Sequence, residues 1–221
     1  MDYFDKLLLT VDGYNKKYPN GNTPFKVALF DVDGVLVNGE PFSTHLARDY
    51  GISTEKTAPF FRGRFLECLV GRADLKEELI TYVPLWGWQG SADGFVDYWF
   101  RCEHNINEPL VHAVQQLRQQ GIRCYMATNQ EKYRTAYILE QMGLGEKFDG
   151  IFSSAYIGYM KHETAFFEHI LQELNGIEAE TIIFWDDSSG NIATAKKMGL
   201  RAELYHDFAD FEEKMKRYLG A

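Results

Sequence analysis

The chain alternates short apolar runs with longer segments in which apolar residues recur every three or four positions. The short runs, rich in apolar and β-branched residues, predict buried strands because they are too brief for helices. They lie at 25–30, 122–127, 150–154, 181–185 and 201–205. Helical periodicity is found at 108–120, 131–143, 163–174 and 188–199, and most of these segments end near a glycine. This alternation predicts a doubly wound α/β fold, in which helices cover both faces of a parallel sheet.

Residues 41–106 depart from this alternation. The segment is rich in aromatic residues and arginine, shows helical periodicity in several short pieces and lacks a strand pattern. We expect it to form a small all-helical cap, inserted after the first strand and closing over the strand ends. The aromatic residues expected in its apolar core are Phe60, Phe61, Phe65, Trp99 and Phe100. The α/β core then comprises residues 1–40 and 107–221.

Residues 1–22 are expected to form a helical extension of the core. Their apolar residues at helical spacing are Tyr3, Phe4, Leu7, Leu8, Val11 and Tyr14. Acidic residues precede this short apolar stretch and lysines follow it, which is the reverse of a secretory signal. No apolar run approaches the roughly twenty residues that cross a bilayer. We therefore expect a cytoplasmic protein.

Length, charge and cysteine content narrow the class of protein. A chain of 221 residues is long enough for one substantial core with a smaller lobe. The 23 basic and 32 acidic side chains give a formal net charge of -9, which disfavours nucleic acid and anionic membranes as partners. Cys68, Cys102 and Cys124 form no C-x-x-C motif, so we expect free thiols rather than a disulfide framework or a zinc site.

Polar residues gather where the predicted strands end. They are Asp31 and Asp33 after the first strand, Thr128 and Asn129 after the second, Lys161 near the end of the third segment, and Asp186 and Asp187 after the fourth. In open parallel sheets, ligands bind beyond the carboxyl ends of the strands. Clustered carboxylates need a compensating cation, and Mg²⁺ takes oxygen ligands while keeping room for a phosphate. The pattern predicts a phosphate site with Mg²⁺ as cofactor, in which Lys161 and the Thr128 hydroxyl hold phosphate oxygens.

Asp31 and Asp33 are expected to have different tasks. If Gly34 turns the chain directly after them, Asp33 swings toward a leaving group while Asp31 faces phosphorus. One carboxylate can then attack and form an acyl-phosphate, and the other can protonate the departing alcohol and later activate water.

The same segments resemble the haloacid dehalogenase (HAD) superfamily. The resemblance rests on D-x-D-G-V at 31–35, on strands ending in Thr128-Asn129 and in Asp186-Asp187-Ser188, and on Lys161, and it extends from residue 25 to about residue 206. It implies a Rossmann-like core and a helical cap. Two departures from the family pattern are His162, where proline often follows the lysine, and Asn38, where an acid is common.

The resemblance also implies a role for each site residue. Asp31 is the expected nucleophile, and Asp33 the general acid and base, whose backbone carbonyl also reaches Mg²⁺. The expected metal ligands are Asp31, Asp33, Asp187 and Asp186, of which Asp187 binds the ion directly and Asp186 binds it through water. The residues expected to bind phosphate are Thr128, the Asn129 backbone N–H, Lys161 and Gly34.

The cap is expected to determine the substrate. Arg64 and Arg72 are candidate substrate contacts, although isolated arginines are more often solvated. Asp33 argues against a dehalogenase, since family members that cleave carbon–halogen bonds lack this acid. We therefore expect a phosphatase acting on a small phosphorylated metabolite, either as a monomer or as a homodimer. A sugar phosphomutase and a non-catalytic phosphate-binding module remain the alternatives.

Overall fold

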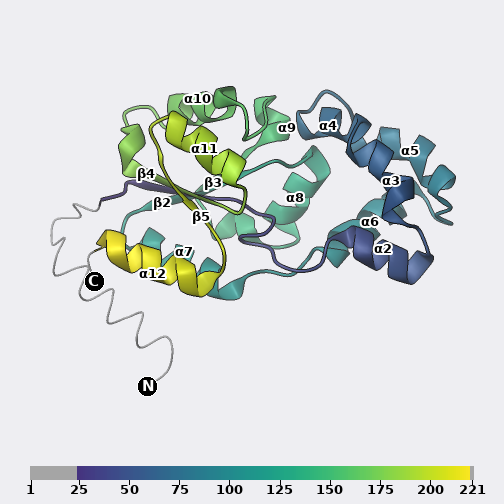
Figure 1. Cartoon of the computed structure of the whole chain (residues 1–221), viewed down its shortest axis with the longest axis horizontal. Helices are drawn as coiled ribbons and strands as arrows, with labels where there is room; N and C mark the ends of the chain where they lie inside the picture. The colour runs from purple at the N-terminus through teal and green to yellow at the C-terminus, as the bar shows by residue number, and fades with distance from the viewer. Residues whose placement is uncertain (1–23, 220–221) are drawn as a thin grey trace, which may run out of the picture.

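A single parallel sheet forms the centre of the molecule (Figure 1). The computed structural model describes residues 24–219, so the helix expected within residues 1–22 lies outside the described residues. The sheet has the order β3-β2-β1-β4-β5, and every pair of neighbouring strands is parallel. The strands are β1 Val27–Phe30, β2 Arg123–Thr128, β3 Gly150–Ser153, β4 Ile182–Asp186 and β5 Arg201–Leu204. All five predicted strands are confirmed.

Helices connect these strands and follow the last one. They are α7 Glu108–Gln119, α8 Lys132–Glu140, α9 Ser154–Ile157, α10 Thr164–Glu173, α11 Ser189–Lys197 and α12 Phe208–Leu219, with short 3-10 helices η1 Leu144–Glu146 and η2 Ala179–Thr181. The helices predicted from periodicity correspond to α7, α8, α10 and α11. The sequence analysis did not predict α9, which is only one turn long, or α12.

Alternating side chains of the strands build two apolar layers. Ala28 and Phe30 of β1 pack in a cluster that includes α7, α8 and α12, whereas Val27 and Leu29 pack in a cluster that includes α10 and α11. Figure 1 shows α10 and α11 on one side of the sheet and α7 and α12 on the other. Since both faces of β1 are buried, its sequence is apolar at every position. The expected doubly wound α/β fold is confirmed.

The chain changes direction across the sheet at β1. From β1 the chain goes to β2 and β3 on one side, and then crosses to β4 and β5 on the other. The loops that follow β1, β2 and β4 therefore meet at one end of the sheet, where doubly wound proteins bind ligands.

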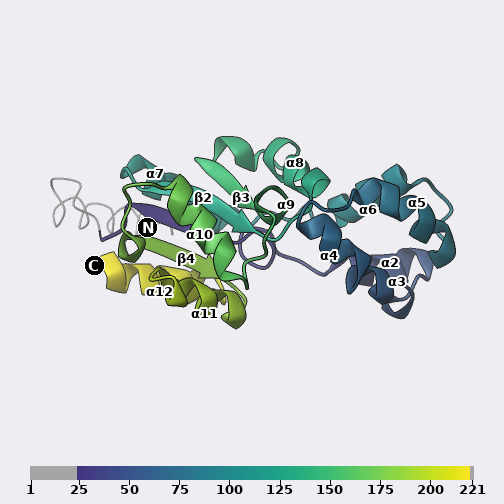
Figure 2. The ribbon, with the colours of Figure 1, turned by 90° about the horizontal axis from the view of Figure 1, so that it is seen from above.

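Five helices lie between β1 and α7. They are α2 Phe42–Tyr50, α3 Thr54–Phe61, α4 Arg64–Leu69, α5 Leu75–Trp86 and α6 Ala92–Cys102. We call these five the cap helices. They have an apolar cluster of their own and lie beyond one end of the sheet (Figures 1 and 2). The division into a core of residues 1–40 and 107–221 and a cap of residues 41–106 stays a prediction.

The chain enters and leaves the cap helices through two adjacent segments. The backbone N–H of Asn38 donates to the carbonyl of Asn105 at 2.8 Å, and that of Asn107 donates to Leu36 at 2.8 Å. The buried side chain of Asn107 also donates to the Val35 carbonyl at 2.9 Å. Hydrogen bonds thus hold the two connections together at the base of the cap helices.

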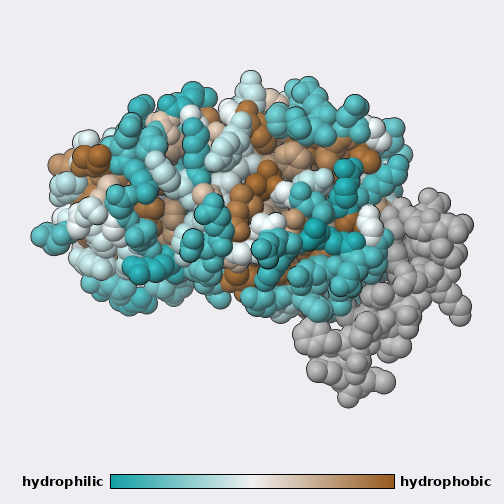
Figure 3. Space-filling view, turned by 180° about the vertical axis from the view of Figure 1, so that it is seen from behind, coloured by the Kyte–Doolittle hydropathy of each residue, from teal (hydrophilic) through white to brown (hydrophobic). Residues whose placement is uncertain are grey.

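The surface of the described residues mixes polar and apolar side chains. On the face shown in Figure 3, hydrophobic residues form small groups separated by hydrophilic ones. The large hydrophobic side chains that are exposed include Ile80 and Leu85, both on α5. Between residues 24 and 219, no helix combines the length and apolar character that a membrane span needs.

Helix α8 fastens the cap helices to the sheet. Arg134 is only 2% exposed, and its guanidinium donates to the carbonyls of Phe100 at 3.1 Å and Glu103 at 2.9 Å, at the end of α6. The neighbouring Tyr133 hydroxyl donates to the Asp74 carboxylate at 2.8 Å. Because a buried guanidinium must keep its partners, Arg134 fixes where α6 ends relative to α8.

Replacing Arg134 tests this contact. The variant Arg134→Met keeps a long apolar side chain but leaves the Phe100 and Glu103 carbonyls without their donor. We expect the free energy of unfolding to fall by about 3 kcal/mol, measured by urea denaturation. The control is Arg101→Met, because Arg101 is exposed on α6 and its Nε donates to the Asp97 carbonyl of the same helix at 3.2 Å. Equal unfolding midpoints for the two variants would contradict the assigned role.

Candidate active site

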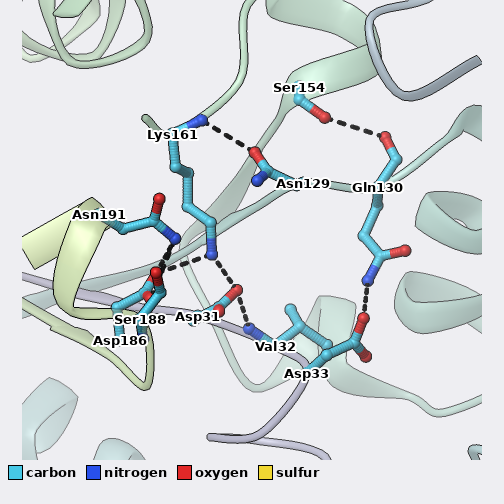
Figure 4. A network of polar contacts seen from close by, with 10 residues as sticks. All are labelled: Asp31, Val32, Asp33, Asn129, Gln130, Ser154, Lys161, Asp186, Ser188 and Asn191. Atoms are coloured by element: carbon cyan, nitrogen blue, oxygen red, sulfur yellow. Dashed lines mark hydrogen bonds and ion pairs between the residues drawn. The ribbon is translucent and has the colours of Figure 1, made fainter. Parts of the chain in front are cut away.

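Four of the predicted site residues meet beyond the carboxyl ends of β1 and β4. Asp31 follows β1, Asp186 ends β4 and Asp187 follows it, while Lys161 comes from the segment between α9 and α10. The Lys161 ammonium forms ion pairs with both Asp31 and Asp186, the latter at 2.7 Å (Figure 4). One ammonium therefore lies between two carboxylates that are delivered by neighbouring strands.

Burial determines the electrostatics of this group. The exposed fractions are 6% for Asp31, 2% for Lys161 and 0% for Asp186. Burial raises the pKa of Asp31 to about 7, and the Lys161 charge opposes this rise. Burial alone would lower the pKa of Lys161, but the carboxylates of Asp31 and Asp186 raise it above its usual value. Lys161 therefore stays charged and compensates the buried acids.

Both carboxylate oxygens of Asp186 accept hydrogen bonds from neighbouring groups of the chain. Its Oδ1 accepts hydrogen bonds from the Ser188 backbone N–H at 2.8 Å and from Asn191 Nδ2 at 3.1 Å, and its Oδ2 accepts from Lys161. Asn191, which lies in the first turn of α11, was not predicted as a site residue. The sequence does hold a signal for this contact. Asp186 ends a strand and Asn191 follows five residues later at the start of a helix, which brings the two side chains to the same end of the sheet.

Three carboxylates are arranged so that they can share a cation. Asp31, Asp186 and Asp187 each offer one oxygen, and these oxygens lie within 4.8 Å of one another. The Asp187 side chain remains accessible to solvent. The surrounding protein still removes part of the water around its carboxylate, and this desolvation together with the Asp186 charge raises the pKa of Asp187. A set of hard oxygen donors with excess negative charge fits Mg²⁺. The structure thus brings together three of the four predicted metal ligands.

Asp33 lies apart from these three carboxylates. It is exposed, and its Oδ2 accepts a hydrogen bond from Gln130 Nε2 at 2.6 Å (Figure 4). The expected contribution of its backbone carbonyl to the metal site stays a prediction. The sequence analysis missed Gln130, because only the folded loop shows that this side chain reaches Asp33.

Gly34 allows the loop after β1 to approach Asp187. Its φ is +79°, and a Cβ atom at this position would lie 2.2 Å from Asp187 Oδ2. Any side chain would collide with the carboxylate, and a non-glycine residue would be strained in this conformation. Gly34 is therefore required by both the backbone and the neighbouring acid.

The loop after β2 holds the lysine segment in place. Thr128 ends β2 and is 1% exposed, and Asn129 Oδ1 accepts a hydrogen bond from the Lys161 backbone N–H at 2.9 Å. The side chain of His162, which replaces the proline common in the family, is exposed. Asn129 thus fixes the backbone of Lys161 without that proline. Phosphate binding by Thr128 and Asn129 stays a prediction.

Arg64 and Arg72 are not among the residues that line the cavity next to the site. This cavity of about 340 Å³ lies between the core loops and the cap helices, and Arg62, rather than Arg64 or Arg72, is among the residues that line it. Arg64 pairs with Glu78 at 2.8 Å and Arg72 pairs with Glu67 at 2.6 Å. Each side chain is thus paired with an acid of the cap helices, and a role for either arginine in substrate binding stays a prediction.

The arrangement of these residues agrees with the family whose model matches the sequence. A model of haloacid dehalogenase-like hydrolases matches residues 25–199. The chain belongs to this hydrolase family. The resemblance inferred from the strand-end motifs is thereby confirmed, and so is the expectation of an enzyme.

Known HAD-like proteins resemble the chain over most of its length. The sesquiterpene phosphatase astK of Aspergillus oryzae is 31% identical over 185 residues, which cover 80% of this chain and 88% of the relative. A predicted HAD-like hydrolase from Porphyromonas gingivalis superposes with a TM-score of 0.74 at 21% identity, covering 90% and 100% of the two chains. A HAD family enzyme from Bacteroides thetaiotaomicron, in complex with magnesium and inorganic phosphate, gives 0.72 at 18% identity, covering 85% and 98%. These structures confirm the fold.

Alanine at position 34 tests the contact with Asp187. We expect Gly34→Ala to cost about 1 kcal/mol of unfolding free energy for its backbone and at least about 1 kcal/mol more for the collision. The control is Gly121→Ala, since Gly121 has a φ of +84° and nothing within 4 Å of a Cβ atom. Chemical denaturation of both variants measures the difference, and equal losses would argue against the collision.

Glu131, at the end of the loop after β2, makes the stability of the protein depend on pH. It caps α8 by accepting the backbone N–H groups of Tyr133, at 2.8 Å, and Arg134. Burial raises the pKa of Glu131 from 4.5 to about 7. As the pH rises through this interval, the unfolded chain releases the proton before the folded chain does. The contribution of Glu131 to stability is therefore full below pH 4.5 and is lost as the pH approaches about 7.

The variant Glu131→Gln removes this titration. Between pH 4.5 and about 7, we expect the unfolding free energy of the wild type to fall by about 3 kcal/mol relative to that of the variant. Urea denaturation across this range measures the difference. Glu140→Gln, at an exposed position of the same helix, should follow the wild type. A constant difference between the wild type and Glu131→Gln would exclude this titration.

Proposed function

We propose that this HAD-like hydrolase is a Mg²⁺-dependent phosphatase that hydrolyses a small phosphorylated metabolite through an aspartyl-phosphate. The observation that carries the proposal is the buried ion pair between Lys161 and Asp31, beside two further carboxylates within metal-sharing distance. A carboxylate fixed in this way can attack phosphorus, while Lys161 offsets the charge of the transferring group. The phosphatase relative at 31% identity supports the same reaction class.

Asp31 acts as the nucleophile in this proposal. Its Oδ1 is engaged by the Val32 backbone N–H at 2.7 Å and by Lys161, which orient the carboxylate (Figure 4). Attack by an Asp31 carboxylate oxygen forms the Asp31–phosphorus bond and breaks the ester bond on the opposite side of phosphorus. The Lys161 ammonium, already in contact with Asp31, stays close to the oxygens that gain negative charge.

Asp33 acts as the general acid and base. Its carboxylate is exposed on the cavity side, where a leaving oxygen would depart, and Gln130 holds one of its oxygens at 2.6 Å. Its protonated carboxyl donates a proton to the leaving oxygen, and the resulting carboxylate then accepts a proton from the water that attacks the aspartyl-phosphate. A dehalogenation reaction needs no such proton transfer, so Asp33 favours ester hydrolysis.

Mg²⁺ would be held by Asp31, Asp186 and Asp187. Because Asp186 already accepts hydrogen bonds from Lys161, Ser188 and Asn191, the exposed Asp187 has more freedom to bind the ion directly. When bound, the ion supplies positive charge that binds and polarises the phosphoryl group. The magnesium and phosphate complex of the Bacteroides enzyme supports this cofactor.

Substitution of the two motif aspartates tests the proposed reaction. With Mg²⁺ and an aryl phosphate, we expect Asp31→Asn to lower kcat at least about 10³-fold, and Asp33→Asn to lower it about 10²- to 10⁴-fold. Released phosphate is measured by colorimetry, and borohydride reduction followed by mass spectrometry detects an acyl-phosphate at position 31. The control Asp97→Asn alters an exposed acid on α6 and should retain wild-type turnover. Full turnover by Asp31→Asn would refute the aspartyl-phosphate route.

A further inference from the structure

The cavity beside Asp33 joins the candidate active site to the cap helices. Asp33, Asn129 and Gln130 line it from the core, and residues of α2, α3, α4 and α6 line it from the cap. Its volume of about 340 Å³ lies within the range typical of small-molecule sites. The group bonded to the leaving oxygen must occupy this space, because Asp33 is the residue proposed to protonate that oxygen.

Four aromatic rings form the cap side of the cavity. Phe42 stacks on Trp99 with ring centroids 4.7 Å apart, and Phe61 lies edge-on to both, at 5.4 and 5.3 Å. Phe65 adds contacts to Phe61 at 5.2 Å and to Trp99 at 5.5 Å. We call these four residues the aromatic wall. Rings in mutual contact present a large apolar surface of fixed shape.

Glu103 holds the aromatic wall through both of its carboxylate oxygens. Its Oε1 accepts the backbone N–H of Phe42 at 3.1 Å, and its Oε2 accepts Nε1 of Trp99 at 2.8 Å. The one polar atom of the Trp99 ring is thereby satisfied by the chain. Among the other lining residues, the buried Thr57 hydroxyl donates to the Thr54 carbonyl at 3.3 Å. The remaining polar side chains on this side are Ser43, Thr54 and Arg62, and the other lining residues of the cap helices are apolar.

We infer that the leaving group is an apolar alcohol, so that the substrate is the monophosphate ester of a hydrocarbon-rich compound. This inference rests on the proposed phosphatase function. The hydroxyl groups of a sugar would lose their water against the aromatic wall without gaining partners, which disfavours binding. An apolar chain gains from leaving water, and it needs no hydrogen bonds from the wall.

Arg62 is the alternative determinant of specificity. It is exposed at the end of α3 and is the cationic side chain among the residues that line the cavity. If Arg62 recognised the leaving group, esters that carry a second negative charge would be preferred. The position of Arg62 at the exposed end of α3, compared with the four contacting rings of the wall, favours the apolar substrate.

A series of alkyl phosphates tests the inference. We expect kcat/KM to rise about fourfold per methylene from ethyl to octyl phosphate, until the cavity is filled. Glycerol phosphate and glucose 6-phosphate represent polar alcohols, and phosphoglycolate represents a leaving group with a second charge. Equal or higher kcat/KM for any of these three than for octyl phosphate would overturn the inference.

Variants of the aromatic wall provide a second test. Phe61→Ala and Phe65→Ala lie on different helices, and each should lower the octyl-to-ethyl ratio of kcat/KM about tenfold, whereas Phe61→Leu should restore part of it. Leu85→Ala is the matched control, since Leu85 is 73% exposed on α5 and does not line the cavity. Ratios for the wall variants that equal those of Leu85→Ala would overturn the assignment.

A binding measurement separates this inference from the proposed function. Octylphosphonate cannot lose its alkyl group, and its calorimetric binding to the Mg²⁺-loaded wild type should be tighter than that of ethylphosphonate, with a negative heat-capacity change. If no ester is hydrolysed, the phosphatase proposal fails whatever the binding shows. If esters are hydrolysed but neither kcat/KM nor phosphonate affinity rises with chain length, only the apolar substrate fails.

Discussion

Repulsion between carboxylates at one end of a parallel sheet is the constraint around which this molecule is built. Asp31 and Asp186 lie at the carboxyl ends of adjacent strands and are almost completely buried, so their ionised forms need a cation close by. The Lys161 ammonium is that cation, since it forms ion pairs with both carboxylates. The backbone of Lys161 is held by Asn129, which follows a third strand, β2. The loops after β1, β2 and β4 and the segment between α9 and α10 therefore contribute either charge or the hydrogen bonds that hold charge in position.

The fold followed from the sequence because its signals are local. An apolar run that is too short for a helix becomes a buried strand, and parallel strands necessarily bring their following residues to one end, which placed Asp31, Asp186 and Asp187 together. The partners of individual side chains could not be predicted in the same way. Gln130 reaches Asp33 across 97 positions of sequence, and Arg64 is neutralised by Glu78 through the packing of two cap helices. Such contacts depend on tertiary structure and leave no local pattern.

The aromatic residues of the cap have two tasks at once. Periodicity predicted that Phe61, Phe65 and Trp99 belong to its apolar core, and the structure packs them in that cluster. Yet Phe61 and Phe65 are only partly buried, because one side of each ring faces the cavity next to Asp33. A sequence pattern distinguishes apolar from polar positions, but it does not tell a ring enclosed on all sides from one that borders an empty space. The surface that the cap presents to this cavity is thus an extension of its core.

The paired connections at the base of the cap helices also bear on how such a protein diversifies. Since Asn38 and Asn105 are already hydrogen bonded, the intervening chain begins and ends at neighbouring points beyond the end of the central strand β1. The entropic cost of closing a segment between two such points rises only slowly with the length of the segment. The cap helices can therefore be replaced during evolution while the cluster of charged residues at the end of the sheet is kept. Such a replacement changes the surface next to the cluster without changing the reacting groups.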